Sequence, residues 1–293
     1  MQHYAGAIDD DPGPGGRAVA TIRQFYGGAG VPVRIDADES EPAAAWRSQR
    51  ARVRGWLDAL DDGEWTRPTR CAEWDVTGLV RHLASGSQFL GYTLHKAQRG
   101  TATTLLRDFD PHTTVQAAAS MLGELSPAEA RESIADMDAN VDGELASFDE
   151  TTWPALAEAP PGHLPAHICV SHFLFDSWVH ERDLMLPRGE TPTCDALETE
   201  VTLRYVLALA SLAAASETAL DVRASEPDLR VGLHVDAETV VVAVGGTPPE
   251  RAAVIEGRAA DIVDRTSGRT AGEVSGDPAG LALLDSFGAL LAG

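Results

Sequence analysis

The stretch YVLALASLAAASETALDVRASEPDLRVGLHV (205–235) contains the change of pattern that decides the fold. Its first eleven residues are almost all Leu, Ala and Val, which is typical of a buried helix. From Leu220 onward, the segments LDVRA and LRVGLHV alternate apolar and polar residues, as half-buried strands do. The next apolar segment, TVVVAVG (239–245), is rich in β-branched Val and also predicts a strand. We therefore expect an α+β protein, helical up to about residue 219.

Five segments before this change show the 3.6-residue apolar period of amphipathic helices. They cover about residues 43–60, 75–90, 113–146, 166–186 and 195–217. Asp75 can cap the second helix, and Ser126-Pro127 restarts the third. Pro187 and Gly189 end the fourth. The sequence thus predicts a helical bundle over residues 42–219, followed by a small α/β domain over residues 220–293.

Residues 1–41 are expected to form an N-terminal extension, because they are rich in Gly, Pro and Asp. Within them, RAVATIRQF (17–25) predicts one short helix. Tyr4, Phe25 and Tyr26 are aromatic in an otherwise polar segment, so we expect them to anchor the extension onto the body of the protein. A disordered tail is the alternative.

The composition excludes several classes of partner. The net charge of −22 and the pI of about 4.6 argue against binding to nucleic acid or anionic membranes, which need clustered Lys and Arg. The three cysteines are odd in number and lack CxxC spacing, as expected in a reducing compartment. The chain start resembles no secretory signal, and the longest apolar run, 205–215, is too short to span a bilayer. We expect a cytoplasmic monomer or homodimer.

The candidate site lies in HFLFDSWVHERDL (172–184), an apolar segment that carries His172, Asp176 and His180 at four-residue spacing. Residues four apart share a helix face, so Asp176 and His180 could hold one metal ion through nitrogen and oxygen. A third ligand would come from another helix of the bundle, and His82 in LVRHLASG is the best candidate. Two alternatives stay open: an ordinary Asp–His salt bridge, and a hydrogen-bonded core histidine at position 82.

Neighbouring residues have both structural and functional interpretations. His172 continues the same line by one turn and could be a supporting group or a pocket wall. Arg182 and Asp183 could form a structural ion pair or orient the site, and we assign Asp183 to cofactor binding on the second interpretation. Cys71 is more simply a small buried hydrophobic residue than a nucleophile, because nothing nearby in the sequence predicts an activated thiol.

Three segments resemble the mycothiol-dependent maleylpyruvate isomerase family. They are WLDALDDGEWTRPTRCAEWDVTGLVRHLA (56–84), DSWVHERDL (176–184) and DIVDRTSGRTAGEVSGD (261–277). The first resembles the family's Pro-Thr-x-Cys-x-x-Trp turn with its metal histidine, and the second resembles the carboxylate and histidine motif. The third resembles the Gly-Arg and Gly-Asp segment of the C-terminal domain. The resemblance implies a DinB-like, metal-binding four-helix bundle followed by a sterol-carrier-like domain.

The resemblance also implies site roles and chemistry. It implies that His82, Asp176 and His180 bind zinc or another divalent metal, and that Arg269 reaches back to the cleft. Such a metal stabilises a thiolate, and since the motif offers no thiol of its own, the thiol would be mycothiol. The thiolate would add to an electrophilic small molecule, giving cis–trans isomerisation or S-transfer. Arg269 would hold an anionic group, as a catalytic and cofactor-binding residue, and His172 would shuttle a proton near neutral pH.

The sequence departs from the family in two places. Asp176 stands where the family commonly has Glu, and the extension over residues 1–41 is unusual. We therefore expect a specialised relative that acts on a larger substrate, in secondary metabolism. The rival interpretation is a non-catalytic or metal-free protein that binds a small molecule on the same fold. A zinc-responsive regulator is less compatible, because Cys71 and Cys169 lack the close spacing of its ligands.

Overall fold

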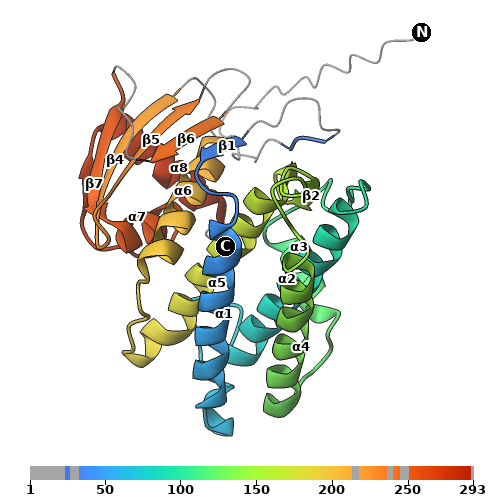
Figure 1. The fold of residues 1–293 in the computed structure, drawn as a ribbon. Helices are drawn as coiled ribbons and strands as arrows, with labels where there is room; N and C mark the ends of the chain where they lie inside the picture. Colours follow the sequence, from blue (N-terminus) through green and yellow to red (C-terminus); the bar gives the residue numbers. More distant parts are fainter. Residues whose placement is uncertain (1–23, 27–32, 213–217, 236–239, 245–250, 292–293) are drawn as a thin grey trace, which may run out of the picture.

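A helical bundle and a sheet domain lie side by side in the computed structural model of the chain (Figure 1). The structure describes residues 24–26, 33–212, 218–235, 240–244 and 251–291. The predicted α+β class, with the helical part first and the sheet second, is confirmed. No helix in these ranges is both long and apolar enough to cross a membrane.

Four long helices pack against one another in the bundle. They are α1 (Glu41–Asp58), α2 (Val76–Ala97), α4 (Pro127–Leu145) and α5 (Ala166–Met185). The short α3 (Thr113–Ser120) lies against α2, and 3-10 turns occur at Asp62–Glu64 and Leu186–Arg188. The side chain of Asp75 caps α2, and Ser126 with Glu129 forms a capping box at α4. The predicted restart at Ser126-Pro127 therefore separates α3 from α4.

A buried ionic cluster fixes the four long helices relative to one another. Arg50 of α1 and Asp138 of α4 are each 1% exposed, and Arg50 Nη2 lies 2.9 Å from Asp138 Oδ1. Arg50 also donates to the Ser177 hydroxyl of α5 at 2.9 Å, and Ser87 of α2 donates to Asp138 at 2.8 Å. Because α2 and α5 carry the candidate ligands, this cluster also sets the spacing of the site.

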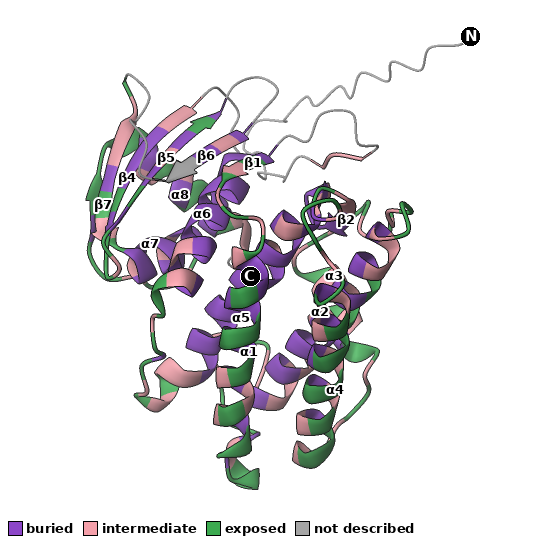
Figure 2. Ribbon diagram, in the orientation of Figure 1, coloured by how far each residue is buried: buried purple, intermediate pink, exposed green. Residues whose placement is uncertain are grey.

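The sheet domain has the strand order β1-β6-β5-β4-β7-β8, in which β1 (Val33–Asp36) comes from the segment before the bundle. Its elements are β4 (Thr218–Ser225), β5 (Leu229–Val235), β6 (Val240–Val244), β7 (Ala253–Arg258), α7 (Ala259–Thr266), β8 (Val274–Gly276) and α8 (Pro278–Leu291). Helix α6 (Ala196–Leu212) packs against α1 and α5 on one side and against α7 and the sheet on the other. One apolar cluster consequently continues from α5 through α6 into the sheet, as the buried residues in Figure 2 show.

Part of the segment predicted as an extension is built into the fold. Strand β1 (Val33–Asp36) pairs in parallel with β6, with Val33 opposite Val240. Phe25 pairs with Gly162 in the hairpin of β2 (Leu156–Ala159) and β3 (Gly162–Pro165). Gly162 has φ 103°, and a Cβ there would lie 2.2 Å from the Phe25 carbonyl oxygen, so the contact requires glycine. The segment therefore touches both the bundle and the sheet.

Tyr26 is a second anchor on the same hairpin. Its hydroxyl donates to Glu158 Oε1 at 2.9 Å, and the guanidinium of Arg107 lies 4.7 Å from its ring centre. Glu158 is fully buried and also accepts the backbone N–H groups of Leu105 and Leu106, each at 2.8 Å. Phe25 and Tyr26 thus contact the body as expected. Tyr4, and all but the last two residues of the helix predicted at 17–25, lie outside the described residues.

Candidate metal centre

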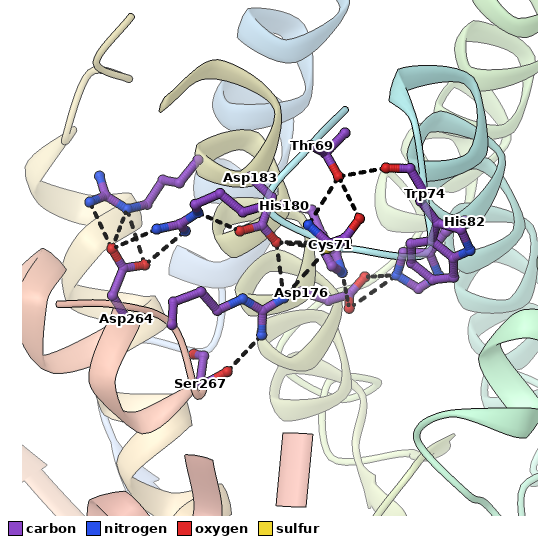
Figure 3. Close-up of polar contacts among 12 residues, drawn as sticks. Thr69, Cys71, Trp74, His82, Asp176, His180, Asp183, Asp264 and Ser267 are labelled. Atoms are coloured by element: carbon purple, nitrogen blue, oxygen red, sulfur yellow. Dashed lines mark hydrogen bonds and ion pairs between the residues drawn. The ribbon is translucent and has the colours of Figure 1, made fainter. Parts of the chain in front are cut away.

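The structure brings His82 of α2 together with Asp176 and His180 of α5 (Figure 3). His82 Nε2 lies 3.1 and 3.3 Å from the two Asp176 oxygens, and His180 Nε2 lies 3.5 Å from Asp176 Oδ1. One donor atom from each of the three residues lies within 4.8 Å of the other two. His82 and His180, the two histidines expected as ligands, therefore face one carboxylate, although they are 98 positions apart in the sequence.

The donor set fits a single divalent cation. A tetrahedral zinc ion with bonds of about 2.0–2.1 Å places neighbouring donor atoms about 3.3 Å apart. The separations from Asp176 to His82 and to His180, 3.1 to 3.5 Å, match that value. Asp176 therefore reaches both imidazoles despite being one methylene shorter than the Glu of the family pattern.

The same three groups also form an ionic triad. Burial disfavours the charged form of Asp176, but His82 and His180 outweigh it and hold the pKa of Asp176 well below its usual range. Burial likewise opposes the imidazolium of His180, yet the charge of Asp176 raises its pKa well above the ordinary value. The salt-bridge alternative thus fits these distances as well, and it is compatible with metal binding.

Asp183 supports His180 from the opposite side of the ring. Its Oδ2 lies 2.9 Å from His180 Nδ1, while Arg70 Nε donates to Oδ1 at 2.7 Å and Arg269 Nη2 to Oδ2 at 2.9 Å. Burial would raise the pKa of Asp183, but the hydrogen bond from His180 and the charges of His180 and Arg269 hold it well below its usual range. An ionised carboxylate only accepts, so Nδ1 carries a proton and Nε2 faces Asp176.

The contacts of Asp183 favour the orienting interpretation of this residue. Its side chain is completely buried beneath His180. Direct contact with a cofactor, which we assigned to it from the sequence, would require Arg70 or Arg269 to move.

Arg269 joins the C-terminal domain to the site. It follows α7, and besides Asp183 its Nη1 donates to the Ser267 carbonyl at 2.7 Å. Nearby, Asp264 of α7 pairs with Arg70 at 3.1 Å and with Arg182 of α5 at 3.0 Å. Three guanidinium groups thus face two carboxylates at this junction. Arg269 thus contacts the carboxylate behind the candidate ligand His180, and its role in binding stays a prediction.

Cys71 is the residue whose position the sequence did not predict. Its Sγ lies 3.2 Å from Asp183 Oδ2 and 3.7 Å from His180 Nδ1, so the expectation that the chain has no thiol at the site is wrong. Cys71, His180 and Asp183 also form a cluster with metal-ligand geometry. Arg70 and Arg269 already hold the Asp183 oxygens, however, and their charges oppose a cation there. The cation position beside Asp176 is therefore favoured.

His172 lies in a different environment from the one expected. Its Nδ1 is 2.8 Å from the Tyr205 hydroxyl, and burial lowers its pKa to about 4, although Asp176 opposes the shift. The expectation that His172 titrates near neutral pH is therefore wrong. Burial also raises the pKa of Tyr205 well above its usual value, so the phenol stays protonated and donates to Nδ1.

Fold and site together define a two-part α+β protein whose helical bundle carries a His–Asp–His cluster suited to one divalent cation. Residues 46–185 match the family model described as the mycothiol maleylpyruvate isomerase N-terminal domain. For this part of the chain, the match confirms the resemblance given by the sequence motifs. No curated protein sequence matches the chain.

Two solved structures share the fold. Both are crystal structures of mycothiol-dependent maleylpyruvate isomerase, one of them a mutant form. The mutant is 20% identical with a TM-score of 0.58, and the other structure is 22% identical with a TM-score of 0.57. Each alignment covers 83% of this chain and 94% of the other. Because the alignments include most of this chain, the likeness extends into the sheet domain as well as the bundle.

Proposed function

We propose that this chain is a metal- and thiol-dependent enzyme that uses mycothiol, as the name of its N-terminal domain family and the titles of the similar structures indicate for those proteins. One observation carries the proposal. The Nε2 atoms of the buried His82 and His180 lie 3.1 Å and 3.5 Å from oxygens of the Asp176 carboxylate, a separation suited to neighbouring ligands of one zinc ion.

The cation would be held by Nε2 of His82, one oxygen of Asp176 and Nε2 of His180. Imidazole and carboxylate donors suit zinc, and three protein ligands leave a fourth position open, as in catalytic zinc sites. When bound, such a cation stabilises the thiolate form of a thiol at neutral pH. The protein's contribution is to keep both Nε2 atoms facing Asp176, which the Asp183 contact does for His180.

Arg269 is proposed to bind the anionic group of the substrate. Its guanidinium is the cationic group that the C-terminal domain places beside His180, and paired N–H donors suit a carboxylate or enolate. Asp183 holds Arg269 and His180 together, so the anion would be fixed relative to the metal centre. His172 takes a different role from the proton shuttle first expected. With Nδ1 accepting from Tyr205, its proton lies on Nε2, which makes it a neutral hydrogen-bond donor.

The reaction follows from the chemistry of a thiolate. Addition to an electron-poor alkene carbon forms a carbon–sulfur bond and turns the double bond into a single bond that can rotate. Release of the thiol then gives cis–trans isomerisation, which is the activity named for the similar structures. If instead the enolate formed by the addition takes up a proton at carbon, the carbon–sulfur bond is retained and the product is a thioether, which is S-transfer. Both outcomes use the same residues, and the substrate class is an electrophilic small molecule.

The rival proposal is a metal-free protein that binds a small molecule. It has one observation in its favour: the Asp176 carboxylate lies within ion-pair distance of both histidines, at 3.1 Å from His82 and 3.5 Å from His180. In that case the triad would be a buried ionic cluster of the bundle core, and no thiol chemistry would follow from it.

The deciding experiment incubates the purified protein with mycothiol and maleylpyruvate or another activated alkene, with and without a chelator. We expect isomer or thiol adduct only when both metal and thiol are present. His82→Ala should abolish metal content and turnover. His95→Ala serves as the matched control, because His95 lies on the same helix and pairs with Glu144 away from the site. Equal rates after complete metal removal would refute the metal-dependent mechanism.

A further inference from the structure

The turn at residues 69–74, just before α2, presents the Trp74 side chain to the site, and the mechanism above gives this residue no role. The Thr69 hydroxyl donates to the Trp74 carbonyl at 2.9 Å, and the Trp74 N–H donates to the Cys71 carbonyl at 3.0 Å. These bonds fix the backbone from which the indole projects.

The indole of Trp74 lies flat against the imidazole of His82 (Figure 3). The ring centres of Trp74 and His82 are 5.0 Å apart with an interplanar angle of 24°. The Trp74 ring lies farther from the His180 ring, at 6.3 Å and an interplanar angle of 58°. The indole Nε1–H donates to Gln116 of α3 at 2.8 Å. Gly78 leaves room for the ring, because a Cβ there would lie 3.3 Å from the Trp74 Cβ and Cδ1 atoms.

The two histidines are held in different ways. His180 has Asp176 at Nε2 and Asp183 at Nδ1, so two polar contacts fix its ring plane. For His82, the hydrogen-bond partner found among the described residues is Asp176, and it contacts Nε2. An imidazole with one polar partner can rotate about that contact unless its face is packed. Trp74 stacks on the face of the His82 ring, whereas the His180 ring meets it edge-on, with the ring centres 4.8 Å apart.

We propose that Trp74 is a positioning residue of the metal centre, whose indole face holds the His82 ring with Nε2 directed at the cation. The inference rests on the proposed function, since it assumes that His82 is a ligand. Cation binding draws electrons from the imidazole, and the electron-rich face of an indole favours such a ring more than an aliphatic side chain does. Loss of a residue that orients a metal ligand typically weakens metal binding about 10- to 100-fold.

The test compares Trp74→Phe, which keeps a ring, with Trp74→Leu, which keeps apolar bulk alone. Zinc affinity is measured by competition with a chromophoric chelator, and folding by circular dichroism and thermal melting. We expect W74F to stay within about threefold of wild type and W74L to bind about tenfold more weakly or worse. Trp56→Leu is the matched control, because the Trp56 indole is also half-buried and also donates one hydrogen bond, to Glu190 at 2.7 Å.

Gln116→Ala gives a second measurement that does not depend on W74L folding. Gln116 is exposed, so its loss frees the indole without disturbing the core, and zinc affinity should fall about twofold to threefold. Gln88→Ala, at an exposed position of α2, should have no effect. Wild-type affinity in folded W74L, or in Q116A if W74L does not fold, would overturn the role of Trp74. A wild-type protein that binds no zinc would instead refute the metal centre itself.

Discussion

His180 Nδ1 lies 2.9 Å from Oδ2 of Asp183, a completely buried carboxylate that also binds Arg269 of the C-terminal domain. One side chain therefore orients a candidate metal ligand and holds the arginine proposed to bind substrate. Both contacts share one oxygen atom, while Arg70 Nε donates to the other oxygen at 2.7 Å. The candidate metal centre and the domain junction thus meet at one carboxylate that keeps a second arginine partner.

Asp183→Asn should weaken zinc binding about 10- to 100-fold, as loss of a carboxylate behind a ligating histidine does elsewhere. The amide keeps the shape of the side chain but removes the charge that fixes the Nδ1 proton of His180. Competition titration with zinc measures the effect. Asp264→Asn is the control, because Asp264 pairs with Arg70 and Arg182 in the same cluster without touching His180. Equal losses in both variants would mean that the junction, and not the His180 contact, determines affinity.

Arg269→Gln should separate catalysis from metal binding. Loss of a guanidinium that holds a developing negative charge should lower kcat/KM about 100-fold, while zinc affinity changes little. Arg269→Lys should recover only part of the rate, since an ammonium does not reproduce the paired N–H donors. Arg265→Gln is the matched control, because Arg265 lies in α7 and pairs with the exposed Asp285. Full activity in R269Q would exclude Arg269 from substrate binding.

The features predicted from the sequence are those encoded locally. Caps at Asp75 and Ser126 depend on residues three positions away, so the starts of α2 and α4 were predictable. The i,i+4 spacing places Asp176 and His180 on one helix face before any tertiary contact forms. His82 required the family resemblance as well, because nothing in its own helix distinguishes a ligand from a core histidine.

The features that were missed depend on long-range contacts. Strand β1 has four residues within a polar segment and pairs with β6 more than 200 positions away, so no local period marks it. Cys71 reaches the site only because its turn packs on Asp183, 112 positions later. The lowered pKa of His172 follows from burial beside Tyr205, which spacing within one helix does not indicate.

Tyr26→Phe should lower the free energy of unfolding by about 1–2 kcal/mol, since it removes a hydrogen bond to the buried carboxylate of Glu158. Deletion of residues 1–40 should cost more, because it also removes β1 and uncovers the edge of β6 at Val240. Chemical denaturation measures both. Tyr92→Phe is the control, at a tyrosine that is 44% exposed. Unchanged stability after the deletion would show that the segment contributes nothing to the fold.

His172 should make the protein less stable as the pH falls below neutrality. Its pKa is about 4 in the fold, against about 6.5 in an unfolded chain. Between pH 6.5 and pH 4, about the two pKa values, His172 is protonated in the unfolded chain but neutral in the folded protein. The free energy of unfolding therefore falls with decreasing pH. The full difference between the two pKa values corresponds to about 3 kcal/mol of stability. Because His172 is partly exposed, solvent screening reduces the expected loss of stability to about 2 kcal/mol.

His172→Asn should remove this loss, because the Asn side-chain oxygen can accept from the Tyr205 hydroxyl as Nδ1 does, without taking up a proton. Urea denaturation at intervals from pH 4 to pH 7 measures the effect. The decline in stability should be shallower in H172N by about 2 kcal/mol over that range. His112→Asn, at an exposed histidine, should leave the wild-type pH dependence unchanged. Parallel curves for H172N and wild type would show that His172 takes up its proton equally in the folded and unfolded chains, which would restore the proton-shuttle role.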